Sequence, residues 1–363
     1  MKIFLIGKYP EKRNTDEYTK FWLHTMQQKE KNFFYKKLFF KEEPWKTILK
    51  IPYLSWLLLI KKPDILHAQY YAEAVGPCFP ILLLAAKLRP KLKTILLVHE
   101  KPDFLLNHLP NIIKPLYLLF EKITFSLTDH LIVHTHEAKE SIMKYYHIKN
   151  KKISVLPFPW PEAIEIIEEK TVLKEKNKIN EKLIFTIFGR VVPKKGIDIV
   201  LPLIKKLRME SRDVGLIIAG PVPKNHQKYF ASIKNLIKEL SLEEHIHIFD
   251  LLSTRQMSEI YKITDISLFA YRSVTQSAVF YTSLAHEAPV LAFAWPGFSE
   301  FMNKHPIGYL VPANNELKLL EVMKKAMDNP QQLIEFRKNI NSIRNDYSWD
   351  KTVEKYQHIY ETI

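Results

Sequence analysis

Two cations separated by four residues lie in the segment of the chain that most resembles a binding site, LIFTIFGRVVPKKGIDIVLPLI at 183–204. Arg190 directly follows Gly189, and Lys195 directly precedes Gly196. A guanidinium offers a planar fork of donors and an ammonium offers a compact charge, so the two together suit a pyrophosphate group. The spacing alone is equally compatible with a solvated basic loop, so the surrounding elements must support one interpretation or the other.

The residues on either side of this pair predict a strand, a turn and a helix. The apolar run 183–188 lacks alternation, which is typical of a strand buried on both faces of a parallel sheet, and an apolar helix is expected after Gly196. In open α/β sheets, ligands bind at the carboxyl ends of the strands. We therefore expect Arg190 and Lys195 on a loop at the ligand-binding edge of a sheet.

Alternation of strands and helices along the whole chain predicts parallel sheets. The strand candidates are 2–6, 64–68, 94–99, 129–135, 153–157, 183–188, 214–219, 246–249, 266–270 and 289–294. Prolines at 157, 159 and 161 and a polar stretch interrupt the pattern, which restarts at Leu183. We predict an α/β protein with a first domain at 1–158, a linker at 159–181 and a second domain at 182–347. The alternative is one large open sheet with an insertion.

Length and composition agree with two domains. The 363 residues correspond to about two domains at roughly 150 residues each. Cys78 is the one cysteine, so no disulfide can form within the chain, which fits a reducing cytoplasm. The apolar run after Lys2 is too short for a secretory signal, and the longest apolar stretch, 51–60, is about half of what a membrane span needs. We therefore expect a cytoplasmic protein.

The segment GRVVPKKG resembles the G-R-x-x-x-x-K-G signature of retaining glycosyltransferase family 4. Further segments are similar to that family in the same order, at 217–222, 246–273, 286–302, 307–330 and 348–363. The resemblance implies the GT-B fold, in which two Rossmann-like domains with parallel sheets face each other across a cleft and the helix 348–363 completes the first domain. It also implies sugar transfer with retention from a nucleotide-sugar donor, a UDP- or GDP-sugar, without a metal or another cofactor.

The resemblance assigns the donor diphosphate to Arg190 and Lys195, which would neutralise the charge that develops on the leaving group. The family usually has Glu-x7-Glu before its G-x-P-V strand, but Val274 and Thr282 stand at those positions here. The sequence YRSVTQSAV, which starts at Tyr271, is instead similar to a sub-pattern of the same family. The residues expected to contact the donor from this region are Tyr271, Arg272, Thr275, Gln276, Ser277 and Thr282. The competing interpretation is a degenerate, inactive enzyme.

The resemblance also implies roles for single residues elsewhere. Gly7 matches the glycine that ends the family's opening strand and would let the backbone approach the donor phosphate. His99 matches a strand-end histidine, and we expect it to orient the sugar and line the reaction centre as the catalytic residue. Glu300 matches a loop glutamate and is expected to face the donor. His67 and His134 end similar strands and are expected as structural support, with the cleft wall as the alternative.

The net charge of +15 is concentrated in the first part of the chain. Residues 1–160 hold 26 Lys or Arg and 14 Asp or Glu, a net of +12, whereas residues 161–363 contribute +3. In 29–62 and 104–125, lysines lie among aromatic and aliphatic residues. This pattern indicates either ordinary core helices with solvated lysines or a surface that docks on anionic lipid. A lipid-linked or glycan acceptor bound by the first domain would explain the charge and would place the protein on the inner face of the cell membrane.

The sequence is compatible with three functions. The first is a hexosyltransferase of bacterial surface polysaccharide or lipopolysaccharide-type biosynthesis. The second is a non-catalytic GT-B subunit that supports a partner enzyme, which would account for the missing glutamates. The third is a GT-B-like sugar-nucleotide epimerase, which would need no acceptor. A nicotinamide dehydrogenase is not expected, because no G-x-G-x-x-G follows any strand, and nucleic acid is not expected as a partner, because no binding module for it is recognised.

Overall fold

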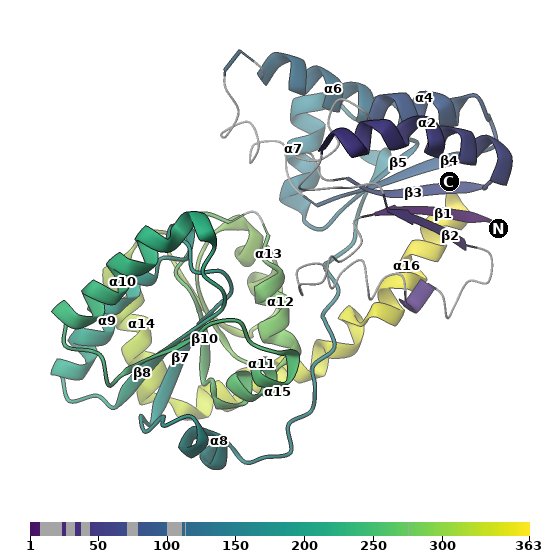
Figure 1. Cartoon of the computed structure of the whole chain (residues 1–363). Coiled ribbons are helices and arrows are strands. Elements are labelled where there is room, and N and C mark those ends of the chain that lie inside the picture. Colours follow the sequence, from purple (N-terminus) through teal and green to yellow (C-terminus); the bar gives the residue numbers. More distant parts are fainter. Residues whose placement is uncertain are drawn as a thin grey trace. The chain divides into compact units, whose positions relative to one another are not determined.

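The computed structural model describes residues 1–7, 24–26, 33–37, 44–70, 79–99, 111–112, 114–274 and 276–363. The chain divides into two compact units, Met1–Pro161 with Tyr347–Ile363, and Glu162–Asp346 (Figure 1). Each unit is built on a six-stranded sheet whose paired strands are all parallel. This confirms the predicted class of two α/β domains with parallel sheets.

The sheet of the first unit has the strand order β2-β1-β3-β4-β5-β6. Its strands are β1 (Ile3–Gly7), β2 (Phe33–Lys37), β3 (Ile65–Tyr70), β4 (Lys93–Val98), β5 (His130–Val133) and β6 (Ile153–Val155). Its helices are α2 (Pro44–Lys61), α4 (Phe79–Lys87), α6 (Lys114–Leu127), α7 (His136–Tyr146), the short η2 (Asn150–Lys152) and, from the end of the chain, α16 (Trp349–Thr362).

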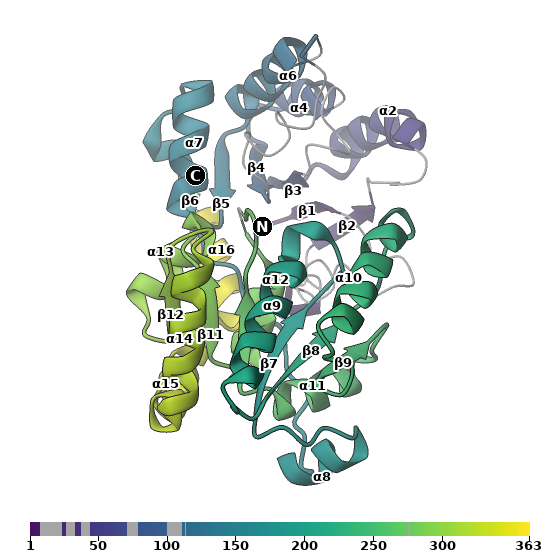
Figure 2. The same cartoon turned by 90° about the vertical axis from the view of Figure 1, so that its left-hand side faces the viewer.

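Helices cover both faces of this first sheet. Alternate residues of a strand point to opposite faces, so Phe4 and Ile6 of β1 pack in one core with residues of α2, α4, α6 and α7. Ile3 and Leu5 pack in another core with α16. Figures 1 and 2 show α2 and α4 together in one layer, with α16 in another. The last helix therefore belongs to the first unit because it completes that unit's core.

The sheet of the second unit has the strand order β12-β11-β10-β7-β8-β9. Its strands are β7 (Leu183–Phe188), β8 (Val214–Ala219), β9 (Ile246–Phe249), β10 (Ile266–Phe269), β11 (Val290–Phe293) and β12 (Gly308–Val311). Its helices are α8 (Lys170–Lys176), η3 (Pro193–Lys195), α9 (Ile197–Met209), η4 (Lys224–His226), α10 (Gln227–Glu239), α11 (Thr254–Ile263), α12 (Ala278–Ala285), α13 (Pro296–Lys304), α14 (Glu316–Asp328) and α15 (Pro330–Ile343), followed by η5 (Arg344–Tyr347).

Two strands were not predicted, and both lie at sheet edges. β2 reads FFYKK and β12 reads GYLV. An edge strand has a neighbour on one side only, so it can be short and need not be an uninterrupted apolar run. The sequence signal for such strands is correspondingly weak.

The stretch 159–181, expected as a linker, contains α8. Within it Ile166, Leu173 and Ile179 are buried in a core that also contains residues of β7 and α11. This packing explains why residues from Glu162 onward belong to the second unit.

Some predictions fall outside the described residues. These are Thr275 and parts of the two basic, aromatic segments, namely 29–32, 38–43, 104–110 and 113. Within the part of the chain that is described, no helix has both the length and the apolar content to cross a membrane.

Candidate functional site

Arg190 and Lys195 follow β7, the strand of the second sheet at which the strand order reverses. β7 is the first strand of this sheet along the chain, β8 and β9 follow on one side of it, and β10, β11 and β12 follow on the other. In α/β sheets, ligands bind outside the carboxyl ends of the strands at such a switch point. The loops that follow β7 and β10 both begin at this edge because these two strands are parallel neighbours.

The turn between β7 and α9 depends on two glycines with left-handed backbone. Gly189 has a φ of 98° and Gly196 a φ of 68°. A Cβ on Gly196 would lie 2.0 Å from the carbonyl oxygen of Ala270, so the turn touches the backbone at the end of β10. A glycine meets both demands at low cost. This close approach holds Lys195, the preceding residue, against the end of β10.

The Lys195 side chain reaches back across the turn to Tyr271. Its ammonium donates a hydrogen bond to the Tyr271 hydroxyl and lies 4.1 Å from the centroid of the same ring. A Cβ on Gly189 would be 3.0 Å from Nζ, so the ammonium lies directly beside the end of β7. No described carboxylate forms an ion pair with it.

The protein environment of Lys195 disfavours the charged form of its side chain. Burial lowers the pKa of Lys195 to about 7, with smaller contributions from the positive charges of Lys194 and Arg190. A buried ammonium without a carboxylate is unfavourable, and an anion placed beside it supplies the missing charge. The arrangement is therefore suited to bind an anion.

Tyr271 is held from several sides. Trp295 donates a hydrogen bond from Nε1 to the Tyr271 carbonyl at 2.6 Å, and the ring centroid of Phe298 lies 5.6 Å from that of Tyr271. The Ser277 hydroxyl lies 3.5 Å from the Tyr271 hydroxyl. Burial raises the pKa of Tyr271 above its usual range. Tyr271 therefore stays neutral and orients the Lys195 ammonium without supplying a negative charge.

Arg272, expected to contact the donor, binds Asp198 in this structure. Its Nη1 donates to Asp198 Oδ1 at 3.0 Å, and Tyr229 donates its hydroxyl proton to the same oxygen at 2.9 Å. The backbone N–H of Arg272 donates to the Lys194 carbonyl at 3.0 Å. These contacts connect the loop after β10 to the turn after β7, so Arg272 positions the turn. Asp198 was not among the predicted site residues, although an acidic residue in the first turn of a helix is a recognisable sequence signal.

Other predicted residues at this edge leave donors unused. Arg190 is exposed and makes no hydrogen bond or ion pair with the described residues. Gln276 is half-buried, and its Nε2 is buried without a hydrogen-bond partner in the described part of the chain. Ser277 occupies the N-cap of α12, but its side chain makes no capping hydrogen bond. Arg190 and Gln276 therefore have donors that no described residue uses, while the Ser277 hydroxyl has Tyr271 as its neighbour.

The two positions that carry glutamates in the family supply no carboxylate here. Val274 is buried, at 6% exposure. Thr282 is half-buried and donates its hydroxyl proton to the Ala278 carbonyl at 3.0 Å within α12. Glu300, also half-buried, lies on α13.

In the first unit, Gly7 ends β1, while His99 and His134 follow the neighbouring strands β4 and β5. The two histidine rings lie 5.3 Å apart. His134 Nδ1 donates to the Leu156 carbonyl at 2.9 Å, and burial lowers the pKa of His134 to about 4. His134 is therefore a neutral, fixed ring beside His99, which is half-buried.

His67 has a different role from His99. It is fully buried, and its Nδ1 lies 2.5 Å from the hydroxyl of Tyr360 on α16. Its ring also packs at 5.2 Å from that of Tyr356. Burial lowers the pKa of His67 to about 3, so the ring is neutral. His67 connects the last helix to the sheet.

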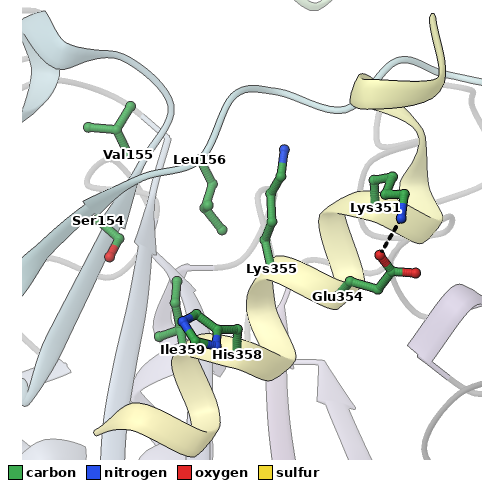
Figure 3. Close-up of a pocket in the computed structure, with 8 residues that line it drawn as sticks. All are labelled: Ser154, Val155, Leu156, Lys351, Glu354, Lys355, His358 and Ile359. Carbon is green, nitrogen blue, oxygen red and sulfur yellow. Dashed lines mark hydrogen bonds and ion pairs between the residues drawn. The ribbon is translucent and has the colours of Figure 1, made fainter.

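A pocket of about 450 Å³ lies in the first unit between β6 and α16 (Figure 3). Its walls are formed by Ser154, Val155, Leu156, Lys351, Glu354, Lys355, His358 and Ile359. Lys351 and Glu354 form an ion pair at 2.8 Å, and a hydrogen bond of 2.8 Å joins the Ser154 hydroxyl and His130 Nε2. None of the predicted site residues lines this pocket. Among the described residues, no group of three or more His, Cys, Asp or Glu is arranged to hold a metal ion.

Comparison with known proteins gives matches in both units. Residues 169–343 match the model of the family described as Glycosyl transferases group 1, and residues 15–159 match that of Glycosyltransferase Family 4. D-inositol 3-phosphate glycosyltransferase of Gordonia bronchialis is 26% identical over 180 residues, which are 48% of this chain and 39% of the relative. The GPI3 subunit of phosphatidylinositol N-acetylglucosaminyltransferase of Saccharomyces cerevisiae is 22% identical over 255 residues, 66% of this chain and 53% of the relative. The matched part thus spans about half or less of these relatives.

Among solved structures, Anabaena HepE in complex with UDP has a TM-score of 0.78, with 100% of both chains covered at 11% identity. At this identity the likeness shows the fold alone. The two family matches together take in most of the sequence and each falls mainly on one of the two parallel-sheet units. The chain therefore belongs to the group 1 glycosyltransferases of the GT-B fold.

Proposed function

We propose that this protein transfers a sugar from a nucleoside-diphosphate donor to a glycan or lipid-linked acceptor. One observation carries the proposal. Lys195 is half-buried, and its ammonium lies at the switch point of a parallel sheet with a tyrosine hydroxyl and no described carboxylate as its partner. A diphosphate supplies negative charge at a place where no described residue supplies it.

In this proposal Lys195 and Arg190 bind the diphosphate. As the bond between the sugar and the diphosphate breaks, the two cations neutralise the charge that remains on the leaving group. Gln276 and Ser277 contribute donors next to the start of α12, where backbone N–H groups add to the binding of an anion. Tyr271 orients the Lys195 ammonium.

The remaining expected residues keep proposed roles. Gly7, Thr275, Thr282 and Glu300 are further donor contacts, Arg272 positions the turn through Asp198, and His99 orients the sugar. His99 suits this role because the neutral His134 ring packs beside it.

We infer retention of configuration and independence from metal ions. The acceptor oxygen bonds to the anomeric carbon on the face that the diphosphate leaves, and the acceptor's proton passes to a diphosphate oxygen. This route needs cations on the diphosphate and no carboxylate nucleophile on the protein. The anomeric configuration of the product, read by NMR, and activity in the presence of a chelator test the two inferences separately.

The acceptor is proposed from chemistry and from the names of the relatives. The names of two relatives include inositol 3-phosphate and phosphatidylinositol, and the first 160 residues of this chain carry a net charge of +12. A negatively charged, lipid-linked acceptor fits that charge. It would place the protein at the inner face of the cell membrane, in surface polysaccharide or lipopolysaccharide-type biosynthesis.

The proposed donor class is tested by thermal shift with UDP-, GDP-, ADP- and CMP-sugars. A ligand that binds the folded state raises the unfolding temperature in proportion to the logarithm of its concentration over Kd. We expect one of the diphosphate sugars, UDP or GDP, to raise the unfolding temperature and CMP-sugars, which carry a single phosphate, to leave it unchanged. If no nucleotide sugar raises it, the proposed donor site is wrong.

Donor affinity is expected to fall as the pH rises through about 7. The pKa of Lys195 is about 7 in the empty protein, and a bound diphosphate favours the protonated form, so its pKa rises on binding. Between the pKa of Lys195 without ligand and its higher pKa in the complex, each unit of pH increase weakens donor binding by up to about tenfold. Calorimetry between roughly pH 6 and pH 9 measures this, and buffers of different ionisation enthalpy reveal the proton taken up. An affinity that does not change over this range would contradict a role for Lys195 as a titrating ligand.

A non-catalytic subunit is the alternative, and buried Val274 favours it, since an apolar residue replaces a donor contact of the family. Such a subunit would bind a nucleotide sugar and show no turnover with any acceptor preparation. The transferase predicts release of the nucleoside diphosphate when a membrane extract is added as the source of acceptor.

A further inference from the structure

The helices α2, α4 and α6 carry exposed apolar stripes with the same spacing. The three helices pack in sequence on one face of the first sheet (Figure 1). Each stripe occupies positions i, i+3 and i+7, which lie on one side of a helix. The members are Tyr53, Trp56 and Ile60; Ile81, Leu84 and Leu88, of which Leu88 follows the end of α4; and Leu116, Leu119 and Ile123, with exposures from 36% to 73%.

These stripes are separate from the residues that hold the helices on the sheet. The opposite sides of the same helices are already buried in the core, with Leu54 and Leu58 of α2, Leu82 of α4 and Phe125 of α6 at 1% exposure or less. With Leu59 and Ile112, these helices and the residues next to them account for 11 of the 21 large hydrophobic side chains that are exposed in the described residues. Apolar surface concentrated in one place indicates a partner.

The exposed charged groups on the three helices themselves have one sign. The three helices contain a single acidic residue, Glu121, which is buried and accepts hydrogen bonds from tyrosine hydroxyls. The exposed lysines on or just beyond these helices include Lys61, Lys62, Lys91 and Lys122. Two acidic residues also lie just beyond the helices: Asp64 is exposed, and Asp129 pairs with Lys87 at 2.6 Å. A partner that covers this surface must therefore be apolar where it meets the stripes and negatively charged where it meets the lysines.

We propose that α2, α4 and α6 form a three-helix face that docks on the surface of a bilayer containing anionic phospholipid. The acyl chains take up the stripes and the headgroups pair with the lysines. Tyr53 and Trp56 are stacked at 6.1 Å and exposed, and such side chains favour the interfacial region of a membrane. On the three helices the one acidic residue, Glu121, is buried, so the exposed charges that these helices carry are basic, which suits a uniform anionic layer better than a protein with charges of both signs.

Docking of the three-helix face would bring the first unit to a lipid-linked acceptor. This role of the face rests on the proposed function. The three-helix face also includes residues outside the two basic, aromatic segments 29–62 and 104–125. The α4 stripe lies in neither segment, and its place between α2 and α6 is a result of the fold.

The test is co-sedimentation of the full chain with vesicles of phosphatidylglycerol and phosphatidylcholine, compared with vesicles of phosphatidylcholine alone. The variant replaces the middle residue of each stripe, Trp56→Ser, Leu84→Ser and Leu119→Ser. The matched control replaces three exposed apolar residues of the second unit, Ile167→Ser, Met209→Ser and Leu317→Ser, with exposures of 88%, 73% and 77%. All six side chains are exposed, so both variants are expected to fold.

We expect the unmodified chain and the control to bind the anionic vesicles, with binding that weakens at high salt. The stripe variant is expected to bind roughly tenfold less or worse. Equal binding by the stripe variant and the unmodified chain would overturn the proposal, and so would absence of binding to anionic vesicles. A dimer in light scattering that the stripe variant abolishes would show that a second copy covers the face, which also overturns it. Nucleotide-sugar binding of the same variants, measured without vesicles, reports on the proposed function separately.

Discussion

Replacing Lys195 with methionine is expected to weaken nucleotide-sugar binding about a hundredfold while the fold is kept. The ammonium is the buried cation at the switch point, and losing a desolvated contact to an anion costs on the order of 3 kcal/mol, which is about a hundredfold in Kd. Without ligand, the variant should be as stable as the unmodified chain or more stable, because it removes a charge that has no carboxylate partner among the described residues. Calorimetry gives the affinity and thermal unfolding gives the stability.

The control for this substitution is Lys206→Met. Lys206 lies in the last turn of α9, at the opposite end of that helix from this turn, and is exposed, so its loss should change the affinity by less than about twofold. Arg190→Ala should weaken binding roughly tenfold, since its exposed guanidinium is partly screened by water. If Lys195→Met and Lys206→Met bind the donor equally well, the diphosphate is not bound at this turn.

Replacing Gly196 with alanine is expected to destabilise the second unit by about 3 kcal/mol and to weaken donor binding as well. The backbone at this position has a φ of 68°, which costs an alanine roughly 1–2 kcal/mol. The added Cβ would meet the Ala270 carbonyl oxygen at 2.0 Å, and neither backbone can move without displacing Lys195 or β10. A loss of this size should lower the unfolding temperature by roughly 6–12 °C.

Gly196→Asn separates the two causes, because asparagine tolerates a positive φ better than alanine does but carries the same Cβ. If the contact with Ala270 dominates, the two variants should lose similar stability, and if the backbone conformation dominates, asparagine should be the milder change. Unfolding temperatures of both variants near that of the unmodified chain would show that the turn does not approach β10 as the structure has it.

The sequence itself was sufficient for the fold class and for the position of the cation pair. Strands buried on both faces give long apolar runs, and these were visible at 183–188, 214–219 and 266–270. A basic turn that follows such a strand lies at the carboxyl edge of a parallel sheet whatever the rest of the chain does, because strand direction fixes the edge. For this reason the location of Arg190 and Lys195 could be predicted from the sequence. The edge strands β2 and β12 could not be predicted, because they do not form long apolar runs.

Only the tertiary structure decided what each polar residue near the pair does. Arg272 and Asp198 are 74 residues apart in the chain, and their ion pair exists because β10 lies next to β7. The enclosed state of Lys195 likewise depends on Tyr271, a residue that the chain brings back from the next strand in the sheet.

The same distinction holds for the first unit. The sequence shows that 29–62 and 104–125 are basic and apolar, and it determines the spacing of each stripe, because a helix places i, i+3 and i+7 on one side. It does not determine which side of each helix faces the sheet, since all three helices are apolar on more than one side. Packing against the sheet buries one side of each and leaves the three stripes exposed, and that choice is made by contacts between segments far apart in the chain.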